Sequence, residues 1–293
     1  MKKSAGHDRF LLSFVPEQWD VIKVFSTFPL KGTKNTRLLS RGLKSVNDHL
    51  EKYRTFAGLA NKLIPGFEVD REQVENNGYS PAIHSKEFAA VVESCVCELY
   101  STLDGVRDVI FVIYNDVQGV QKKSNEKLYR KASDGEYGDD FPSELNEILA
   151  HAYNDWFKNL RDFRTEMTHG SLGSTSMDHE TKKIRYFHQG MGKNRNSLIM
   201  EDFVEFISAL YLKVLNHLNE VFSFLYNTLS LQPTSVRCGI YKGRFYERLV
   251  EPERPLTNSS GYCVARQWFD TMPEFKCPLS QDCRAYENAI TKL

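Results

Sequence analysis

The sequence has no excess charge of either sign and no long apolar run. Lysine and arginine together number 38, aspartate and glutamate also number 38, and the formal net charge is zero. Proteins that hold long stretches of duplex nucleic acid usually carry a basic excess, so a polyanion could be bound here only by a local basic patch. No window reaches the roughly 18 uninterrupted apolar residues of a membrane-spanning helix, and we therefore expect no contact with a membrane.

Signatures of several common enzyme classes are also missing. The sequence contains no Gly-rich phosphate loop, no nucleophile elbow and no His-Glu-x-x-His motif, which argues against P-loop nucleotide hydrolases, α/β-hydrolases and zinc-dependent proteases of that type. Residues 1–15 begin with basic side chains but lack the continuous apolar core of a secretory signal peptide. We expect a cytoplasmic protein, in which cysteines stay reduced.

Apolar residues recur at helical spacing through the first 230 residues. The clearest series follows Ser80-Pro81, a typical helix start, and its members are three or four residues apart. They are Phe88, Val92, Cys95, Leu99, Leu103, Val106, Ile110, Ile113, Val117 and Val120. Similar series predict helices over residues 39–63, 142–167 and 200–229. Four long helices predict an all-α fold, arranged as an antiparallel bundle.

Three segments depart from this pattern. Residues 122–140 lose the periodicity and are predicted to form a helix end and a solvated loop. Residues 171–178 are predicted to be a flexible connector. Residues 182–199 alternate in polarity around a Gly-containing turn, which predicts a small β-hairpin inserted before the last helix.

The predicted organisation has two parts. Residues 1–232 form a helical domain with its core at about 36–230, and residues 233–293 form a C-terminal module. This module is short of helical periodicity and rich in cysteine, proline, glycine and aromatic residues. We therefore predict an irregular structure for it.

The end of the third predicted helix carries basic and hydroxyl side chains on one face. On a helical wheel at about 100° per residue, this polar face holds Arg161, Arg164, Thr165, Thr168 and His169. Gly170 is expected to end the helix in the left-handed conformation. A solvated helix end is one interpretation, because basic side chains interact favourably with the C-terminal end of a helix dipole. Phosphodiester chemistry is the other, since histidine exchanges protons near neutral pH and arginine holds phosphate through its planar fork.

The stretch Arg164-Thr165-Glu166-Met167-Thr168-His169 resembles the Arg-x4-His motif of the HEPN superfamily. In that family the motif lies near the end of a long helix, in a bundle of about this size. Thr165 stands where family members most often have asparagine, and His169 leads into Gly170-Ser171 where some members have a His-x-Tyr ending. The resemblance covers about residues 36–230 and implies an HEPN-like helical bundle.

The same resemblance implies a metal-independent endoribonuclease that needs no cofactor and acts on RNA as a homodimer, with both motif copies lining one cleft. A ribose 2′-hydroxyl would attack the adjacent phosphorus and leave a 2′,3′-cyclic phosphate. Arg164, His169 and Thr165 would be catalytic, and Arg161 and Thr168 would bind the substrate. The implied setting is a toxin or phage-defence effector with an antitoxin or another regulatory protein as partner. A non-catalytic module that binds a nucleotide or a protein partner is the alternative.

A local basic patch follows on the predicted hairpin. Lys183 and Arg185 are candidate substrate-binding residues, because Tyr186 and Phe187 stand beside them in the sequence. Cations meet phosphates and aromatic rings stack on bases when proteins bind single-stranded RNA. An ordinary exposed hairpin with alternating faces is the other interpretation.

Four of the six cysteines lie in the C-terminal module: Cys238, Cys263, Cys277 and Cys283. A small segment without a large core gains stability from a structural metal ion, so tetrahedral coordination of zinc by these thiolates is one hypothesis. The spacings do not match the Cys-x2-Cys knuckle of common zinc folds, and no histidine follows His217. Buried free thiols are therefore the other hypothesis.

Overall fold

The computed structural model describes residues 21–32, 36–120, 124–189, 197–254, 256–257 and 259–291. The chain divides into two units, one of residues 37–224 and one that combines residues 1–36 with residues 225–293. Helices predominate in the described residues, but each unit also contains a three-stranded antiparallel sheet. The all-α prediction is therefore correct only as a statement that the chain is mainly helical.

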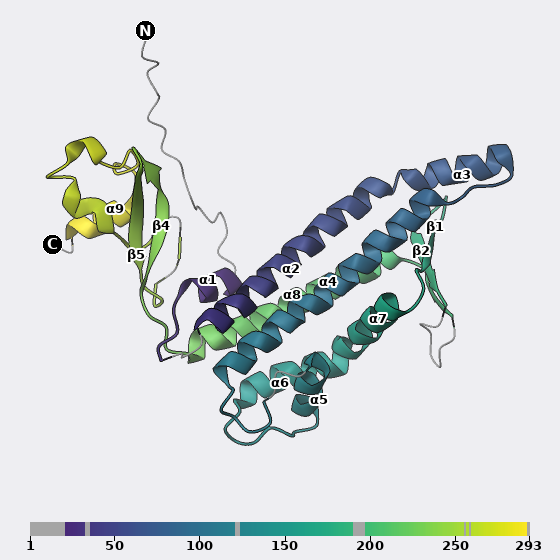
Figure 1. Ribbon diagram of the computed structural model, residues 1–293, viewed down its shortest axis with the longest axis horizontal. Coiled ribbons are helices and arrows are strands. Elements are labelled where there is room, and N and C mark those ends of the chain that lie inside the picture. The colour runs from purple at the N-terminus through teal and green to yellow at the C-terminus, as the bar shows by residue number, and fades with distance from the viewer. Residues whose placement is uncertain are drawn as a thin grey trace, which may run out of the picture. The chain divides into compact units, whose positions relative to one another are not determined.

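The first unit is built mainly from helices, the last of which continues past the end of the unit at Phe224. They are α2 (Thr36–Leu63), α3 (Gly66–Asn77), α4 (Ile83–Ile113), α5 (Asn125–Ser133), α6 (Ser143–Ala152), α7 (Lys158–His169) and α8 (Phe203–Thr228). A π-helical turn, Tyr153–Phe157, joins α6 to α7. Figure 1 shows α2 beside α4 and α8, where Tyr53 and Tyr211 stack with ring centroids 4.4 Å apart.

The apolar series predicted for the longest helix forms the buried face of α4. Its first seven members, from Phe88 to Ile110, are at most 3% exposed. The helix ends at Ile113, so Val117 and Val120 lie in the turns that follow and the predicted helix was too long. Turn-favouring residues such as Asn115 and Gly119 explain this end, and Gly119 has a φ of 93°.

Two glycines allow α2 and α4 to approach closely. A Cβ atom on Gly105 would lie 2.8 Å from the backbone nitrogen of Val46, and one on Gly42 would lie 3.2 Å from that of Val109. Because neither glycine has a Cβ, the two backbones can pack at a distance that larger residues would prevent. This contact fixes α4, which carries most of the residues that face the predicted motif.

Two segments predicted as loops contain regular structure. Within residues 122–140, Ser124 caps α5 by accepting a hydrogen bond from Lys127 N at 3.1 Å. The predicted connector contains β1 (Ser174–Met177), which pairs with β2 (Ile184–His188). β2 also pairs with β3 (Leu198–Met200), as the hairpin prediction required. The Gly-containing turn of that hairpin lies outside the described residues.

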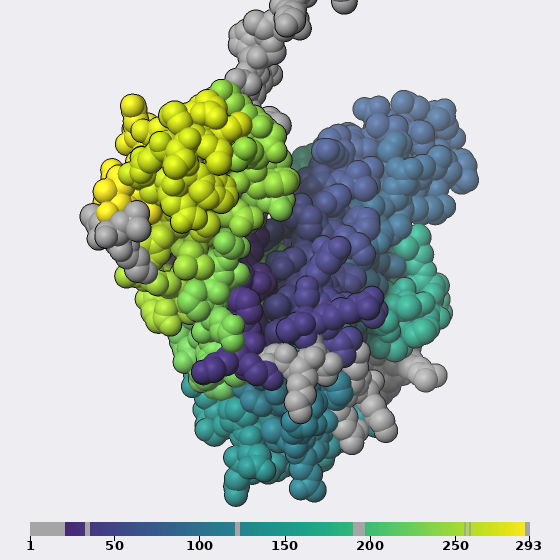
Figure 2. Space-filling model, turned by 60° about the vertical axis from the view of Figure 1, so that its left-hand side comes forward, coloured from purple at the N-terminus to yellow at the C-terminus, as the bar shows by residue number. Residues whose placement is uncertain are grey.

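The second unit is not irregular, contrary to the prediction. It contains α1 (Val21–Thr27), β4 (Thr234–Tyr241), β5 (Arg244–Val250), β6 (Tyr262–Cys263) and α9 (Arg284–Thr291), with short 3-10 helices at Val264–Trp268 and Pro273–Phe275. Lys242 and Gly243 both have positive φ and form the two-residue turn between β4 and β5. Figure 2 shows the strands and α9 as one continuous surface, coloured from green-yellow to yellow.

Two small clusters lie in the core of the second unit. Phe28 packs with Val236 and Val250 in one. Tyr246, Ala265 and Phe269 form the other. None of the helices in the described ranges is both long and apolar enough to cross a membrane.

Candidate functional site

The orientation of the motif helix is set by its apolar face. Leu160 is fully buried, and Phe163 packs edge-to-face against Phe206 of α8 with ring centroids 5.1 Å apart. The π-helical turn before α7 buries both Trp156 and Phe157. With this face fixed, the polar face of α7 lies partly against α4 and partly toward solvent.

Arg164 lies against α4. Its guanidinium carbon is 5.4 Å from the ring centroid of Tyr100, a cation–π contact. Asp104, one helical turn further along α4, lies within electrostatic range of Arg164, and burial raises the pKa of its carboxyl although Arg107 and Arg164 oppose this. Within the described ranges, the Arg164 side chain makes no hydrogen bond and no ion pair, so its five N–H donors remain available to a ligand.

The two threonines of the motif have different surroundings. Thr168 Oγ1 donates to the Arg164 carbonyl at 2.7 Å and lies 3.9 Å from Cys97 Sγ of α4. Thr165 is exposed, and its hydroxyl donates to the Arg161 carbonyl at 2.8 Å. Both hydroxyl protons are used within the helix, whereas both oxygens can still accept a hydrogen bond.

Arg161 and His169, the other two basic residues of the polar face, differ in their surroundings. Arg161 donates to Asp162 at 2.8 Å and lies 3.9 Å from Glu126, so part of its charge is neutralised. His169 is the last residue of α7 and is exposed to solvent. Arg164 and Thr168 thus contact α4, and Thr165, Thr168 and His169 are all exposed to solvent.

Gly170 does not end α7 in the left-handed conformation that we predicted. Its φ is −93° and its ψ is −163°, which is extended backbone. Its amide donates to the Glu166 carbonyl at 2.6 Å, and a Cβ on this residue would lie 2.6 Å from the same oxygen. The close approach of the chain, and not a positive φ, is therefore the reason for glycine here.

A buried carboxylate holds the segment that follows the motif. Glu93 of α4 is 7% exposed and accepts hydrogen bonds from Gly173 N at 2.7 Å and from the Tyr186 hydroxyl at 2.8 Å. His188 Nε2 donates to the Ser171 carbonyl at 2.7 Å. These bonds connect α4, the chain after His169 and the sheet β1–β3.

The two hairpin residues that were predicted to bind substrate are paired with carboxylates. Lys183 lies 3.7 Å from Asp202, and Arg185 lies 2.8 Å from Glu201. Tyr186 is fully buried and stacks on Phe203 with ring centroids 4.1 Å apart, so it is not available to stack on a base. Of the predicted aromatic residues, Phe187 is the more exposed, at 39%.

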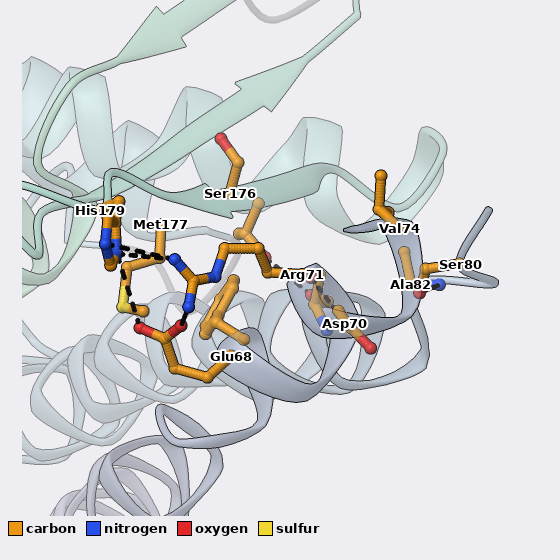
Figure 3. A pocket seen from close by; sticks show the side chains of 12 residues that line it. Glu68, Asp70, Arg71, Val74, Ser80, Ala82, Ser176, Met177 and His179 are labelled. Carbon is orange, nitrogen blue, oxygen red and sulfur yellow. Dashed lines mark hydrogen bonds and ion pairs between the residues drawn. The ribbon is translucent and has the colours of Figure 1, made fainter. Parts of the chain in front are cut away.

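A pocket of about 250 Å³ lies between α3, the start of α4 and β1. Figure 3 shows Arg71 at its centre, 3.0 Å from His179 Nδ1 and 2.8 Å from Glu68. Lys182 also lies 2.9 Å from Glu68. Since its charged groups pair with one another, we interpret this cluster as a clamp that holds the β1–β2 turn against α3.

The four tail cysteines are free thiols of intermediate burial. They lie in the second unit, within electrostatic range of one another. In the parts of the chain that the structure describes, no group of three or more His, Cys, Asp or Glu side chains is already arranged to hold a metal ion.

Sequence reasoning did not identify the α4 side of the site. Glu93, Cys97, Tyr100 and Asp104 follow one another at three or four residues along α4 and face α7 or the segment after it. This spacing was a usable signal, because it places them on one side of the helix beside the apolar stripe. Which helix would face them could not be read from the sequence.

No family model, no curated protein and no solved structure matches this chain.

Proposed function

We propose that the chain is a metal-independent endoribonuclease of the HEPN type, built on an HEPN-like helical bundle and acting as a homodimer in the cytoplasm. The observation that supports this most concerns the contacts of the Arg164 side chain. It is held over the Tyr100 ring at 5.4 Å, and no carboxylate of the described chain bonds to its donors. An arginine fixed in this way, next to an exposed histidine at the end of the same helix, suits a phosphate ligand.

In the proposed reaction, the ribose 2′-oxygen attacks the adjacent phosphorus and its proton passes to a base. The bond to the 5′-oxygen of the next nucleotide breaks, and that oxygen receives a proton. His169 would transfer one of these protons. Arg164 would stabilise the charge on the non-bridging oxygens, and Thr165, Thr168 and Arg161 would contact the phosphate or its neighbours. The products are a 2′,3′-cyclic phosphate and a 5′-hydroxyl.

A second copy of the chain is part of this proposal. Five residues of α-helix separate Arg164 from His169 by about 7.5 Å along the axis and about 140° around it. The two groups therefore point in different directions from one α7, and Thr165 and His169 are exposed. A homodimer that places two α7 ends side by side would bring an arginine and a histidine to one phosphate.

The test is cleavage of bulk cellular RNA by the full-length chain, with no added metal and again with excess EDTA. Wild type should cleave, and the products should carry 2′,3′-cyclic phosphate ends. His169→Ala should abolish cleavage, while His151→Ala, an exposed histidine earlier in the same helical run, should not. Equal cleavage by both variants would contradict a role for His169. Folded, dimeric wild type that binds RNA without cleaving it would favour the non-catalytic binding module.

The biological setting that we propose is a toxin or antiviral effector with an antitoxin or another regulatory protein as partner. Expression of wild type alone should then inhibit growth of the host cell. His169→Ala should be tolerated at the same expression level. Growth inhibition by both proteins would contradict a toxic ribonuclease activity of this site.

A further inference from the structure

Four segments of the second unit each contribute one cysteine to the same region. Cys238 lies at an irregularity in β4, where the register against β5 shifts between Arg237 and Gly239. Cys263 ends β6, and Cys277 follows the 3-10 helix Pro273–Phe275. Cys283 directly precedes α9. The thiols are separated by 14 to 45 residues in sequence except for the last pair, so the tertiary structure brings them together.

The thiols are neighbours in space. Cys238 interacts electrostatically with the other three, Cys263 does so with Cys277 and Cys283, and Cys277 does so with Cys283. Every pair among the four thiols is therefore close enough to interact electrostatically. Cys238, Cys263 and Cys277 also pack against the cluster of Tyr246, Ala265 and Phe269. All four are free thiols of intermediate burial.

A buried positive charge adjoins the same group. Arg248 of β5 is 4% exposed and pairs with Cys263 in the β5–β6 ladder. Its guanidinium lies within electrostatic range of Cys238 and Cys283. Thiolates at these two positions would interact favourably with this charge.

We propose that Cys238, Cys263, Cys277 and Cys283 bind one structural zinc ion as four thiolates. Four thiolates are a ligand set that suits tetrahedral zinc. The four thiol protons leave to solvent as Zn²⁺ binds, and the complex carries a net charge of −2 beside Arg248. The thiols do not form a coordination shell in this structure, so binding includes rotation of the side chains toward a shared centre.

A metal ion here would compensate for a small core. Among the residues that the structure describes, the cluster beside the cysteines has three buried members, Tyr246, Ala265 and Phe269. Small units with limited apolar burial are commonly stabilised by a structural zinc ion, whose binding free energy adds to that of folding. This proposal is independent of the ribonuclease proposal, because the cysteines belong to the other unit and the metal takes no part in the reaction.

The experiment is elemental analysis of the full-length chain, purified under reducing conditions without chelator. Wild type should contain about one zinc per chain. Cys263→Ser and Cys277→Ser should lose most of this zinc. Cys97→Ser, which changes a half-buried thiol of α4, is the matched control and should retain it.

A second measurement does not depend on the folding of the variants. Apo wild type with reduced thiols should bind Co²⁺ and give the thiolate charge-transfer and ligand-field absorption of a tetrahedral site, and Zn²⁺ should displace it. Reduced wild type without zinc and without this cobalt spectrum would overturn the proposal. Zinc retained by both serine variants would also overturn it.

Discussion

The Arg164 guanidinium of α7 lies over the face of the Tyr100 ring of α4, 5.4 Å from its centroid. This contact fixes the direction of the one motif arginine whose donors are not occupied by carboxylates in the described chain. It also places α4 beside the candidate site, because Tyr100 contacts the motif arginine. The strength of this contact can be tested directly.

Replacing Tyr100 should separate the role of the ring from that of its hydroxyl. Tyr100→Phe keeps the aromatic face and should leave RNA affinity unchanged, whereas Tyr100→Leu removes it and should weaken affinity about two- to fivefold. Binding of an RNA with 2′-deoxy linkages, which cannot be cleaved, provides the measurement. In an Arg164→Ala background, Tyr100→Leu should have little further effect. Equal losses for the phenylalanine and leucine variants would assign the effect to the hydroxyl instead.

Glu93 should be important for stability because it satisfies two buried donors. Glu93→Ala leaves Gly173 N and the Tyr186 hydroxyl without their acceptor, at a cost of about 1–3 kcal/mol for each group. Burial and Glu93 both raise the pKa of Tyr186, so its hydroxyl remains a donor at neutral pH. Urea denaturation at pH 7 should show a large loss for Glu93→Ala and a smaller loss for Tyr186→Phe. Similar, small losses for both would show that water replaces the carboxylate.

The glycine at the α2–α4 contact should not tolerate a methyl group. Gly105→Ala places Cβ 2.8 Å from Val46 N, and relief of this clash should cost about 1–3 kcal/mol. Gly58→Ala is the matched control, because nothing lies within 4 Å of a Cβ there and the residue is inside α2. It should stabilise the protein by about 0.5–1 kcal/mol. Thermal denaturation of both variants would measure these changes in stability. Two changes of the same sign would contradict the close contact between α2 and α4.

Acid should destabilise the protein partly through His217. Burial and, to a smaller degree, His151 lower the pKa of His217 from 6.5 to about 3 in the folded chain, where it contacts the Tyr129 hydroxyl at 2.8 Å. The unfolded chain binds this proton below pH 6.5 and the folded chain does not. The contribution of the neutral His217 ring to the free energy of unfolding is therefore fully present above pH 6.5. It falls as the pH decreases toward 3, by up to about 1.4 kcal/mol per pH unit.

Denaturant unfolding between pH 7 and pH 4 would measure this contribution. His217→Gln should flatten the dependence on pH, whereas His151→Gln, at an exposed position, should change it little. Parallel curves for wild type and His217→Gln would contradict the burial of a neutral ring at this position.

Local periodicity in the sequence identified the helices well. The spacing of apolar residues located most of α2, α4 and α8 and the run from α6 to α7, because a helix buries one side and repeats every 3.6 residues. It also predicted β2 and β3. Periodicity did not predict elements that are short or that depend on distant segments. α5 is only nine residues long. β1 is stabilised by pairing with β2, and the sheet of the second unit pairs strands that a loop separates.

The candidate site also combines features that the sequence predicts with features that only the tertiary structure shows. The sequence by itself determined that Arg164, Thr168 and His169 lie near the end of one amphipathic helix, since this depends only on helical geometry. Only the tertiary structure decided that Arg164 meets Tyr100, that Glu93 holds the chain after His169, and that four distant cysteines become neighbours. These relationships depend on which surfaces pack together, and packing is decided by burial over the whole unit and not by the order of residues in one segment.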